Sequence, residues 1–346
     1  MRGLVGDLFP AASPPCYATS FMERGSDISR AAAVLAGGGL VAFPTETVYG
    51  LGADAASDAA VGRIFAAKGR PRHHPLIVHL ADGARLDDWA IDIPDAARAL
   101  ARAAWPGPLT LILSRGPRVS AVATGGAATV GLRVPAHPVA QALLRRFGGG
   151  IAAPSANRFG AVSPTTADHV AGDLGAAIDY LLDGGPCEVG VESTIVDLSR
   201  GRAVLLRPGG LVRERIEPIT GPLAAPDDAA PAAPGTLASH YAPRAEVIAV
   251  AADEVPAAVA AAHGRGARVA VLAPASAFAA WPALPARACR LPDDATGIAR
   301  ALYAALRDLD AEPIDVVIAA LPPAVGLGEA VADRLRRAAG PRRDPS

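Results

Sequence analysis

The feature that most constrains the fold of this chain is the run of residues 221–235, which reads GPLAAPDDAAPAAPG. Proline fixes φ and has no amide N–H to donate, so this run cannot continue a helix or pair inside a sheet. It therefore predicts a linker between a larger front part and a smaller back part of the 346-residue chain. The length alone also favours about two domains rather than one core.

In front of the linker, apolar periodicity predicts strands and helices in irregular alternation. A helix over 27–36 ends at three glycines, and Ser57 is placed to cap a second helix that carries Val61, Ile64 and Phe65 on one face. Further helices are expected over 94–104, 138–147 and 166–174, and strands over 40–43, 76–80, 109–113, 129–134, 151–153, 178–182, 194–198 and 203–206. Because strands outnumber helices, we expect a twisted, mixed α/β sheet.

Behind the linker the alternation is regular. Strands are expected over 246–250, 268–273 and 314–320, with helices near 253–263, 296–309 and 328–338. Strands that alternate with helices in this way indicate a smaller, parallel α/β domain of the Rossmann-like type. No G-x-G-x-x-G follows the first of these strands, so a dinucleotide site is not predicted there.

Composition argues against several classes of protein. A net charge of −1 provides no overall field toward nucleic acid or membrane, and no apolar run is long enough to span a bilayer. The three cysteines, Cys16, Cys187 and Cys289, are far apart, which argues for a reducing compartment and against a zinc site or disulfide framework. We therefore expect a cytoplasmic protein, and residues 1–24, which lack clear periodicity, are expected to form a leader.

Lys68 is the only lysine among 33 basic residues. A chain that uses arginine everywhere else retains an ammonium where a compact point charge on a flexible stem is needed, as for phosphate oxygens in a tight turn. Arg70 adds a second cation, and Gly69 between them allows a close approach of the backbone. An exposed lysine that was retained by chance is the alternative.

Other polar segments follow predicted strands, which is where α/β sheets place ligands. Residues 44–52 read PTETVYGLG, and on their own they are as typical of a polar turn as of a pocket wall. His74 and His79 follow the lysine segment, and a histidine in the strand position of His79 is more typical of a core residue than of a ligand-binding one.

Arg133 lies in an otherwise apolar strand, where its charge needs an anionic partner; a bound ligand and a structural salt bridge meet that need equally well. Residues 153–157 (APSAN) and 163–166 (SPTT) place hydroxyl groups before a helix whose free N–H groups favour anions, although N-capping also explains the second segment. Residues 192–194 (EST) and 207–210 (RPGG) flank the last two strands of the front part.

Three familiar signatures of chemistry are missing from the sequence. It contains no Walker loop, no compact set of metal ligands and no G-x-S-x-G nucleophile elbow. A bound nucleotide would therefore have to be held by other means.

Together these segments resemble the YrdC-domain family, the threonylcarbamoyl-AMP synthases of tRNA modification. The likeness runs from about residue 28 to residue 210, with motifs in family order at 44–52, 68–71 with His79, 129–133, 155–157 with Ser163, and 192–194 with Arg207. Residues 239–243 (SHYAP) and 326–329 (GLGE) resemble the long, two-domain members, in which the linker folds over the active site. The resemblance implies a catalytic domain over 25–210, a linker and lid over 211–243, and a Rossmann-like domain over 244–346.

The resemblance also implies roles for individual residues. Threonine contacts are expected at Thr45, His79, Arg133 and Ser193. ATP contacts are expected at Lys68, Arg70, His74, Thr129, Leu143, Ala153, Ser155, Ser163, Arg207 and Tyr241, with Lys68 and Arg70 in the catalytic role. His74 is a departure, because the family usually has asparagine at this position.

The implied activity is that of a nucleotidyltransferase that condenses L-threonine, bicarbonate and ATP to threonylcarbamoyl-AMP and pyrophosphate. The product serves the threonylcarbamoyladenosine (t6A) modification next to the anticodon, so threonylcarbamoyl-transferase proteins and, indirectly, tRNA would be partners. An N-carboxylate of threonine needs no protein base to attack phosphorus, so alignment and cations would supply the rate. Mg²⁺ would arrive with the nucleotide rather than occupy a dedicated protein site.

Two other interpretations stay open at this point. A carbamoyl-transfer module similar to the hydrogenase-maturation carbamoyltransferases contains a related domain, but those chains are longer and carry cysteine-rich zinc modules. An RNA-binding module would need a basic stripe with stacking aromatic residues, whereas aromatic residues make up only 4% of this chain.

Overall fold

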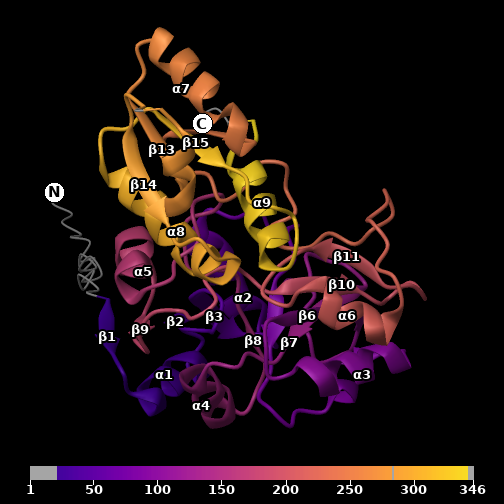
Figure 1. Ribbon diagram of the computed structural model, residues 1–346. Helices are drawn as coiled ribbons and strands as arrows, with labels where there is room; N and C mark the ends of the chain where they lie inside the picture. Colours follow the sequence, from indigo (N-terminus) through magenta and orange to yellow (C-terminus); the bar gives the residue numbers. More distant parts are fainter. Residues whose placement is uncertain (1–21, 283, 342–346) are drawn as a thin grey trace, which may run out of the picture.

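The computed structural model describes residues 22–282 and 284–341. A large mixed sheet with packed helices forms the front domain, and a separate small parallel sheet forms the back domain, as the sequence predicted (Figure 1). The expected leader lies outside the described residues except for its last three, of which Glu23 and Arg24 belong to the first strand.

The front sheet contains eleven of the described strands. They are β1 (Glu23–Gly25), β2 (Val41–Phe43), β3 (Gly50–Asp54), β4 (Ile77–His79), β5 (Ala90–Ile91), β6 (Leu109–Arg115), β7 (Thr129–Arg133), β8 (Ile151–Ala152), β9 (Tyr180–Leu182), β10 (Thr194–Asp197) and β11 (Val204–Arg207). Their order is β1-β9-β2-β3-β8-β4-β7-β6-β10-β11, with β5 beside β6. Parallel pairs such as β4–β7 alternate with antiparallel pairs such as β6–β7, so the sheet is mixed.

Strand β3 was not predicted from the sequence, where residues 44–52 were interpreted either as a polar turn or as a pocket wall. Two glycines lower the β-propensity of this stretch, yet the packing of the sheet requires one of them. A Cβ atom on Gly52 would lie 2.7 Å from Ile151 and 2.8 Å from Phe43, so no larger residue fits there. Only residues 44–49 are therefore a loop, and β3 turns back beside β2.

The helices of the front domain begin where the sequence predicted. They are α1 (Ile28–Ala36), α2 (Asp58–Lys68), α3 (Asp95–Ala104), α4 (Pro138–Phe147) and α5 (Ala167–Leu174). Asp27 and Ser57 cap α1 and α2 with their side chains, and α2 ends at Gly69 in the left-handed conformation with φ of 63°. That turn directs residues 70–76 from the end of α2 toward β4.

The segment over 211–243 contains one helix, which ends before the proline-rich run begins. This helix, α6 (Arg213–Thr220), carries Pro218. Beyond α6, the proline-rich run forms no described helix or strand, and a single bridge joins Ala224 to Val204.

The back domain has a parallel sheet, as predicted. Strands β12 (Glu246–Val250), β13 (Val269–Pro274), β14 (Arg287–Leu291) and β15 (Val316–Ala320) are arranged as β12-β15-β13-β14, all parallel. Helix α7 (Val255–Gly264) lies on the side away from the front domain, whereas α8 (Ala295–Ala311) and α9 (Leu327–Ala338) lie toward it (Figure 1). Strand β14 was not predicted from the sequence, because arginines interrupt its apolar pattern.

One apolar cluster is shared by the two domains. Val48, Val162 and Val191 of the front domain belong to the same buried cluster as Leu302 of α8 and Val331 of α9. Burial of apolar side chains against each other stabilises the joint arrangement, so the back domain is fixed against the front domain. Within the described residues, no helix combines the length and apolar character needed to cross a membrane.

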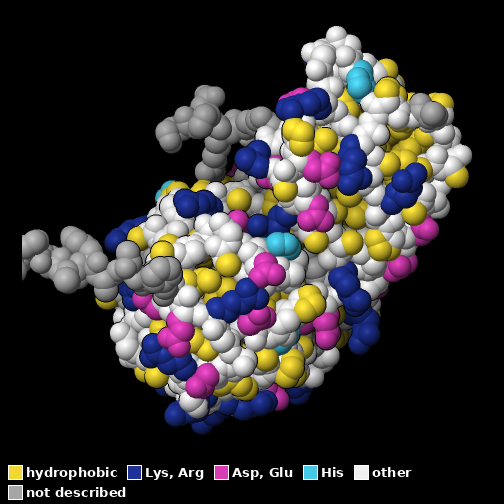
Figure 2. Space-filling model, turned by 90° about the vertical axis from the view of Figure 1, so that its left-hand side faces the viewer, with side chains coloured by type: hydrophobic (Ala, Val, Ile, Leu, Met, Phe, Trp, Pro, Cys, Tyr) yellow, Lys and Arg dark blue, Asp and Glu magenta, His cyan; other side chains and the backbone are white. Residues whose placement is uncertain are grey.

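Arginine and carboxylate side chains are interspersed on the molecular face in Figure 2. Exposed ion pairs occur in the described part of the chain, for example Arg63 with Asp179 at 2.8 Å and Arg30 with Glu23 at 2.7 Å. This face has no continuous basic stripe and so does not support the RNA-binding interpretation.

Candidate active site

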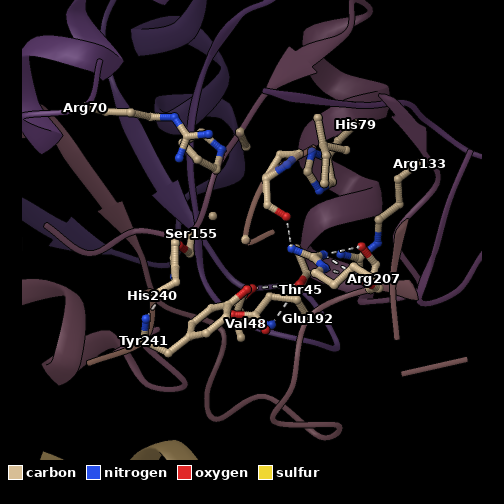
Figure 3. A pocket seen from close by; sticks show the side chains of 17 residues that line it. Thr45, Val48, Arg70, His79, Arg133, Ser155, Glu192, Arg207, His240 and Tyr241 are labelled. Atoms are coloured by element: carbon tan, nitrogen blue, oxygen red, sulfur yellow. Dashed lines mark hydrogen bonds between the residues drawn. The ribbon is translucent and has the colours of Figure 1, made fainter. Parts of the chain in front are cut away.

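One pocket brings the predicted polar segments together (Figure 3). It lies where the 44–49 loop, the ends of β4, β7 and β11, the turn after β8 and the linker meet. Its lining residues are Thr45, Val48, Gly50, Arg70, Ile77, His79, Arg133, Ala153, Pro154, Ser155, Glu192, Ser193, Arg207, Pro234, Gly235, His240 and Tyr241. Residues as far apart in sequence as Thr45 and Tyr241, 196 positions, thus line the same pocket.

Most of the residues expected at the site line this pocket. They are Thr45, Arg70, His79, Arg133, Ala153, Ser155, Ser193, Arg207 and Tyr241. The residues expected at the site that do not line it are Lys68, His74, Thr129, Leu143 and Ser163.

Three of these five lie beside or away from the pocket wall. Thr129 begins β7 and Arg133 ends it, which separates them by about 13 Å at 3.3 Å per residue. Leu143 is fully buried in the core between α1, α4 and β2. The ring of His74 lies 5.4 Å from that of Phe159, which in turn lies 6.2 Å from the ring of His240 in the pocket.

Lys68 is buried directly behind the pocket wall, with 4% of its surface exposed. Its Nζ donates hydrogen bonds to the carbonyl oxygens of Ser155, at 2.6 Å, and of Asn157. Burial and the nearby Arg70 hold the pKa of this amine well below its usual range. Lys68 therefore holds residues 155–157 in place by hydrogen bonds from the side of the segment that faces away from the pocket.

Arg70 and Arg207 line the pocket with backbone carbonyls as their hydrogen-bond partners. Arg70 donates to Pro75 at 2.9 Å, and its guanidinium lies 5.5 Å from the centre of the Phe159 ring. Arg207 donates to Ser193 O at 2.7 Å and to Pro234 O at 2.8 Å. Burial lowers the pKa of Arg70 to about 10 and also lowers that of Arg207. With a pKa of about 10, Arg70 is a cation at neutral pH. Neither arginine forms a salt bridge within the described part of the chain, although the nearby charge of Glu192 acts on Arg207.

Arg133 forms a buried ion pair with Glu46. Its Nη2 lies 2.7 Å from Glu46 Oε1, although the two groups are not oriented as a hydrogen bond. The other oxygen of Glu46 accepts from the backbone N–H of Ala136 at 3.0 Å. The salt bridge that the sequence left as an alternative is thus present, in a residue that also faces the pocket.

His79 is the register partner of Arg133 across β4 and β7, and both side chains face the pocket. Burial, with Arg133 adding to it, lowers the pKa of His79 to about 3, so its imidazole is neutral. Its Nδ1 is buried without a hydrogen-bond partner among the described residues. An unpaired buried nitrogen of this kind is costly unless a ligand meets it.

Hydroxyl groups shape the side of the pocket near β2 and β10. Thr45 Oγ1 donates to Val48 O at 2.7 Å and lies 2.8 Å from Thr47 Oγ1, which closes the loop after β2. Ser193 Oγ lies 2.8 Å from Thr110 Oγ1 on β6.

Tyr241 covers the pocket from the linker in a strained conformation. Its φ is 61°, in the left-handed region that non-glycine residues rarely adopt, and its buried hydroxyl has no hydrogen-bond partner among the described residues. Gly235, also left-handed at φ 76°, makes room for it, since a Cβ there would lie 2.0 Å from Tyr241 Oη.

The site includes charged and aromatic residues that the sequence analysis gave no role. Glu192 and His240 were noted only as parts of motifs, and Glu46 as part of the 44–52 segment, yet the first two line the pocket and the third pairs with Arg133. Burial lowers the pKa of His240 to about 3, so this imidazole is also neutral. The sequence shows that residue 192 is a glutamate, but it does not show which arginines lie beside that glutamate.

The cavity inside this pocket measures about 50 Å³. Sites that bind drug-sized ligands typically measure about 300–1,000 Å³. A nucleotide can therefore enter only if part of the wall moves, and the linker contributes Pro234, Gly235, His240 and Tyr241 to that wall, none of which lies in a helix or strand.

The residues present do not suit a dedicated metal site. Across the described residues, no group of three or more His, Cys, Asp or Glu side chains converges. The pocket carboxylate Glu192 is held by Ser163, Tyr303 and Arg334.

Comparison with known proteins identifies two matched regions. Residues 33–209 match a family described as "Telomere recombination", and residues 211–340 match one described as "Threonylcarbamoyl-AMP synthase, C-terminal domain". Curated relatives named threonylcarbamoyl-AMP synthase come from Bacillus subtilis, 42% identical over 91% of this chain and 93% of the relative, and from Pyrococcus abyssi, 44% identical over 90% and 94%. The crystal structure of P. abyssi Sua5 complexed with L-threonine superposes with a TM-score of 0.84 at 42% identity, covering 92% of this chain and 97% of that one.

Proposed function

The chain belongs to the threonylcarbamoyl-AMP synthase family, in its long two-domain form, and on that premise we propose how its pocket carries out the reaction. The enzyme is an adenylyl-transferring synthase whose product serves the t6A modification of tRNA. We propose that its substrates are ATP, L-threonine and bicarbonate, bound together in the pocket around Arg70, Arg133 and Arg207.

The observation that carries this proposal is the excess of buried positive charge. Arg70 and Arg207 are buried cations whose hydrogen-bond partners are neutral carbonyl and hydroxyl oxygens. A buried charge that no salt bridge pairs is costly, so the resting pocket favours an anionic ligand. The triphosphate of ATP supplies that charge, and Lys68 lies directly behind the same wall.

Threonine binds, in this proposal, at the end of the pocket formed by Arg133 and His79. Figure 3 shows these two side chains on one side of the view and Arg70 on the other. A guanidinium suits a carboxylate by a two-point contact, and the unpaired Nδ1 of His79 offers a further hydrogen bond. Thr45 and Ser193 place hydroxyl groups nearby to select a hydroxyl-bearing substrate.

The chemical step requires alignment more than acid–base catalysis. The amine of threonine and bicarbonate form an N-carboxylate with loss of water. One of its oxygens attacks the α-phosphorus of ATP, the bond from that phosphorus to the bridging oxygen breaks, and pyrophosphate leaves with the electron pair. Cations fixed around the phosphates stabilise the charge that builds up there. Because His79 and His240 are neutral, the buried cations supply this stabilisation.

The linker acts as a lid in this proposal. A cavity of about 50 Å³ cannot hold the substrates, so residues around Gly235 and Tyr241 must move away and return over them. The orphan hydroxyl of Tyr241 would then find a partner on the substrates.

Mg²⁺ is proposed to enter with the nucleotide. The protein residues at the pocket do not fit a resident ion, because Glu192 is held by three partners and Glu46 by Arg133 and Ala136. No step of the proposed reaction is assigned to the ion.

The test is pyrophosphate release from ATP in bicarbonate buffer. We expect release that depends on threonine, whereas release driven by carbamoyl phosphate instead would favour the carbamoyl-transfer interpretation. The variant Arg133→Gln should raise the KM for threonine by about 100-fold, because a charge-assisted contact of roughly 3 kcal/mol is lost, while the KM for ATP changes little.

The matched control is Arg98→Gln, which removes an exposed pair with Asp87 outside the pocket. It should behave as the unmodified enzyme. An unchanged KM for threonine in Arg133→Gln would remove Arg133 from the threonine site.

A further inference from the structure

Glu192 is the negative side chain in a pocket that otherwise presents cations. It is 6% exposed and lines the pocket beside Ser193. Its Oε1 accepts a hydrogen bond from Ser163 Oγ at 2.6 Å. Ser163 therefore contacts a pocket residue, although it does not line the pocket itself. Its Oε2 accepts from Tyr303 Oη at 2.8 Å and from Arg334 Nε at 2.7 Å.

Two of these partners belong to the back domain. Tyr303 lies on α8 and Arg334 on α9, and both side chains are fully buried. Arg334 is also 2.6 Å from Asp333, and its guanidinium lies 5.1 Å from the centre of the Tyr241 ring. Arg334 therefore contacts both the pocket carboxylate and the tyrosine of the linker.

The charge of Glu192 matters because of what lies next to it. Burial would raise the pKa of this carboxyl, but Arg334 and Arg207 outweigh burial and hold it at about 2, so it is ionised. An unneutralised carboxylate at this place would repel phosphate oxygens and draw Arg207 toward itself. Arg207 would then be less available to a ligand.

We infer that Arg334 is a positioning residue of the active site: it neutralises Glu192 and holds it against the back domain, so that Arg207 stays free for an anionic nucleotide. The inference rests on the proposed function, because the anion is taken to be ATP. Through Arg334, the back domain would then contribute to nucleotide binding in addition to the linker.

The test compares KM values with kcat. The variant Arg334→Met keeps much of the apolar bulk but leaves Glu192 without its cation. The KM for ATP should rise at least tenfold, with a smaller change in the KM for threonine, whose proposed contacts lie around Arg133. The matched control is Arg336→Met, an exposed arginine on the same helix, which should leave both KM values unchanged.

A second variant separates charge from packing. Replacing Glu192 by Gln in the Arg334→Met background removes the unpaired charge, and the KM for ATP should return to within about threefold of the unmodified enzyme. If Arg334→Met does not fold, the double variant and Arg334→Lys decide the question. A double variant that folds but still binds ATP tenfold more weakly overturns the inference.

The pH profile provides a readout that a purely structural role would not change. The charged and titratable groups that face Glu192 are Arg207, Arg334, His240, Tyr241 and Tyr303. In Arg334→Met, Glu192 loses its ion-pair partner and burial raises its pKa, so ATP binding should recover as the pH falls and the carboxyl becomes protonated. The double variant should lack this recovery.

The outcomes separate the two proposals. If the unmodified enzyme shows no ATP- and threonine-dependent turnover, the proposed function fails. If it turns over normally and Arg334→Met has the same KM for ATP and the same pH profile, the proposed function stands and the role of Arg334 is overturned. A lower melting temperature with unchanged KM values would likewise make Arg334 merely structural and overturn the inference.

Discussion

At the scale of single residues, the pocket is built from polar groups that are costly to bury. Lys68, Arg70 and Arg207 rely on backbone carbonyls, and His79 and His240 are kept neutral by burial. Such groups lower the stability of the empty protein, and a ligand that pairs with them restores it. The solitary lysine singled out by the sequence is part of this set, although it acts from behind the wall rather than in it.

Two buried histidines of the pocket, His79 and His240, predict a specific pH dependence of stability. Both have a pKa of about 3 in the folded protein, below the usual 6.5 of an unfolded chain, so only the unfolded chain takes up their protons near pH 6. Their contribution is complete above pH 6.5 and is lost as the pH falls toward 3, by about 1.4 kcal/mol per pH unit for each histidine. Urea unfolding at pH 7, 6 and 5 measures this slope.

The control for this prediction is the exposed His263 on α7. His240→Gln should lower the slope by the contribution of one histidine, and His263→Gln should leave it unchanged. Equal slopes in all three proteins would mean that His240 titrates normally in the folded state.

At the scale of elements, the closed position of the linker depends on the close approach of Tyr241 to Gly235. Gly235 and Tyr241 both adopt left-handed backbone conformations, and the tyrosine hydroxyl lies where a side chain on Gly235 would be. Helix α6 and the bridge at Ala224 fasten the earlier part of the linker to the front domain. The later part of the linker lines the pocket, and it is the part that moves in the proposed lid motion.

Gly235→Ala tests this arrangement. The added methyl group would meet Tyr241 Oη, so the linker could not close with Tyr241 in its present place. We expect the KM for ATP, measured by pyrophosphate release, to rise about tenfold, corresponding to roughly 1.4 kcal/mol of lost binding.

Gly148→Ala is the matched control, because Gly148 has φ of 77° and nothing within 4 Å of the added atom. Both variants carry a similar cost of about 1–2 kcal/mol for the left-handed backbone. The same KM in both would show that strain, not the position of Tyr241, sets the effect.

At the scale of the whole molecule, the two domains are joined by hydrogen bonds and an ion pair along α8. Arg307 forms an ion pair with Asp173 at 2.6 Å and donates to the carbonyls of Val162 and Ser163. Arg300 on the same helix donates to Glu188 O at 2.7 Å. Together with the shared apolar cluster, these contacts predict that the domains unfold as one unit.

Calorimetry tests this coupling. The unmodified protein should show one transition, and Arg307→Met should lower its midpoint by several degrees, because roughly 1–3 kcal/mol of partly buried hydrogen bonding between the domains is lost. Arg287→Met, which removes an exposed pair with Glu312 inside the back domain, should shift the midpoint much less. Two separate transitions in the unmodified protein would contradict the coupling.

Prediction from sequence worked best where the signal was local. Helix α4 runs from Pro138 to Phe147, as predicted, because a proline favours its first turn and Gly148 ends it in the left-handed conformation. It failed at β3 and β14, whose glycines and arginines have low strand propensity, so tertiary pairing decides their conformation. The motif residues were largely placed at one pocket, whereas the catalytic role of Lys68 and the nucleotide roles of His74, Thr129 and Leu143 stay predictions.

The sequence by itself therefore determined the order of most elements, the division at the proline-rich run and the kinds of side chain that face a ligand. It did so because helix caps, strand periodicity and turn residues act over a few neighbouring positions. Only the tertiary structure decided that Glu46 pairs with Arg133, that Lys68 binds carbonyls of residues 155 and 157, and that Arg334 reaches Glu192 across 142 residues. These pairings depend on how distant segments are packed together, and no local pattern in the chain records which buried charge meets which.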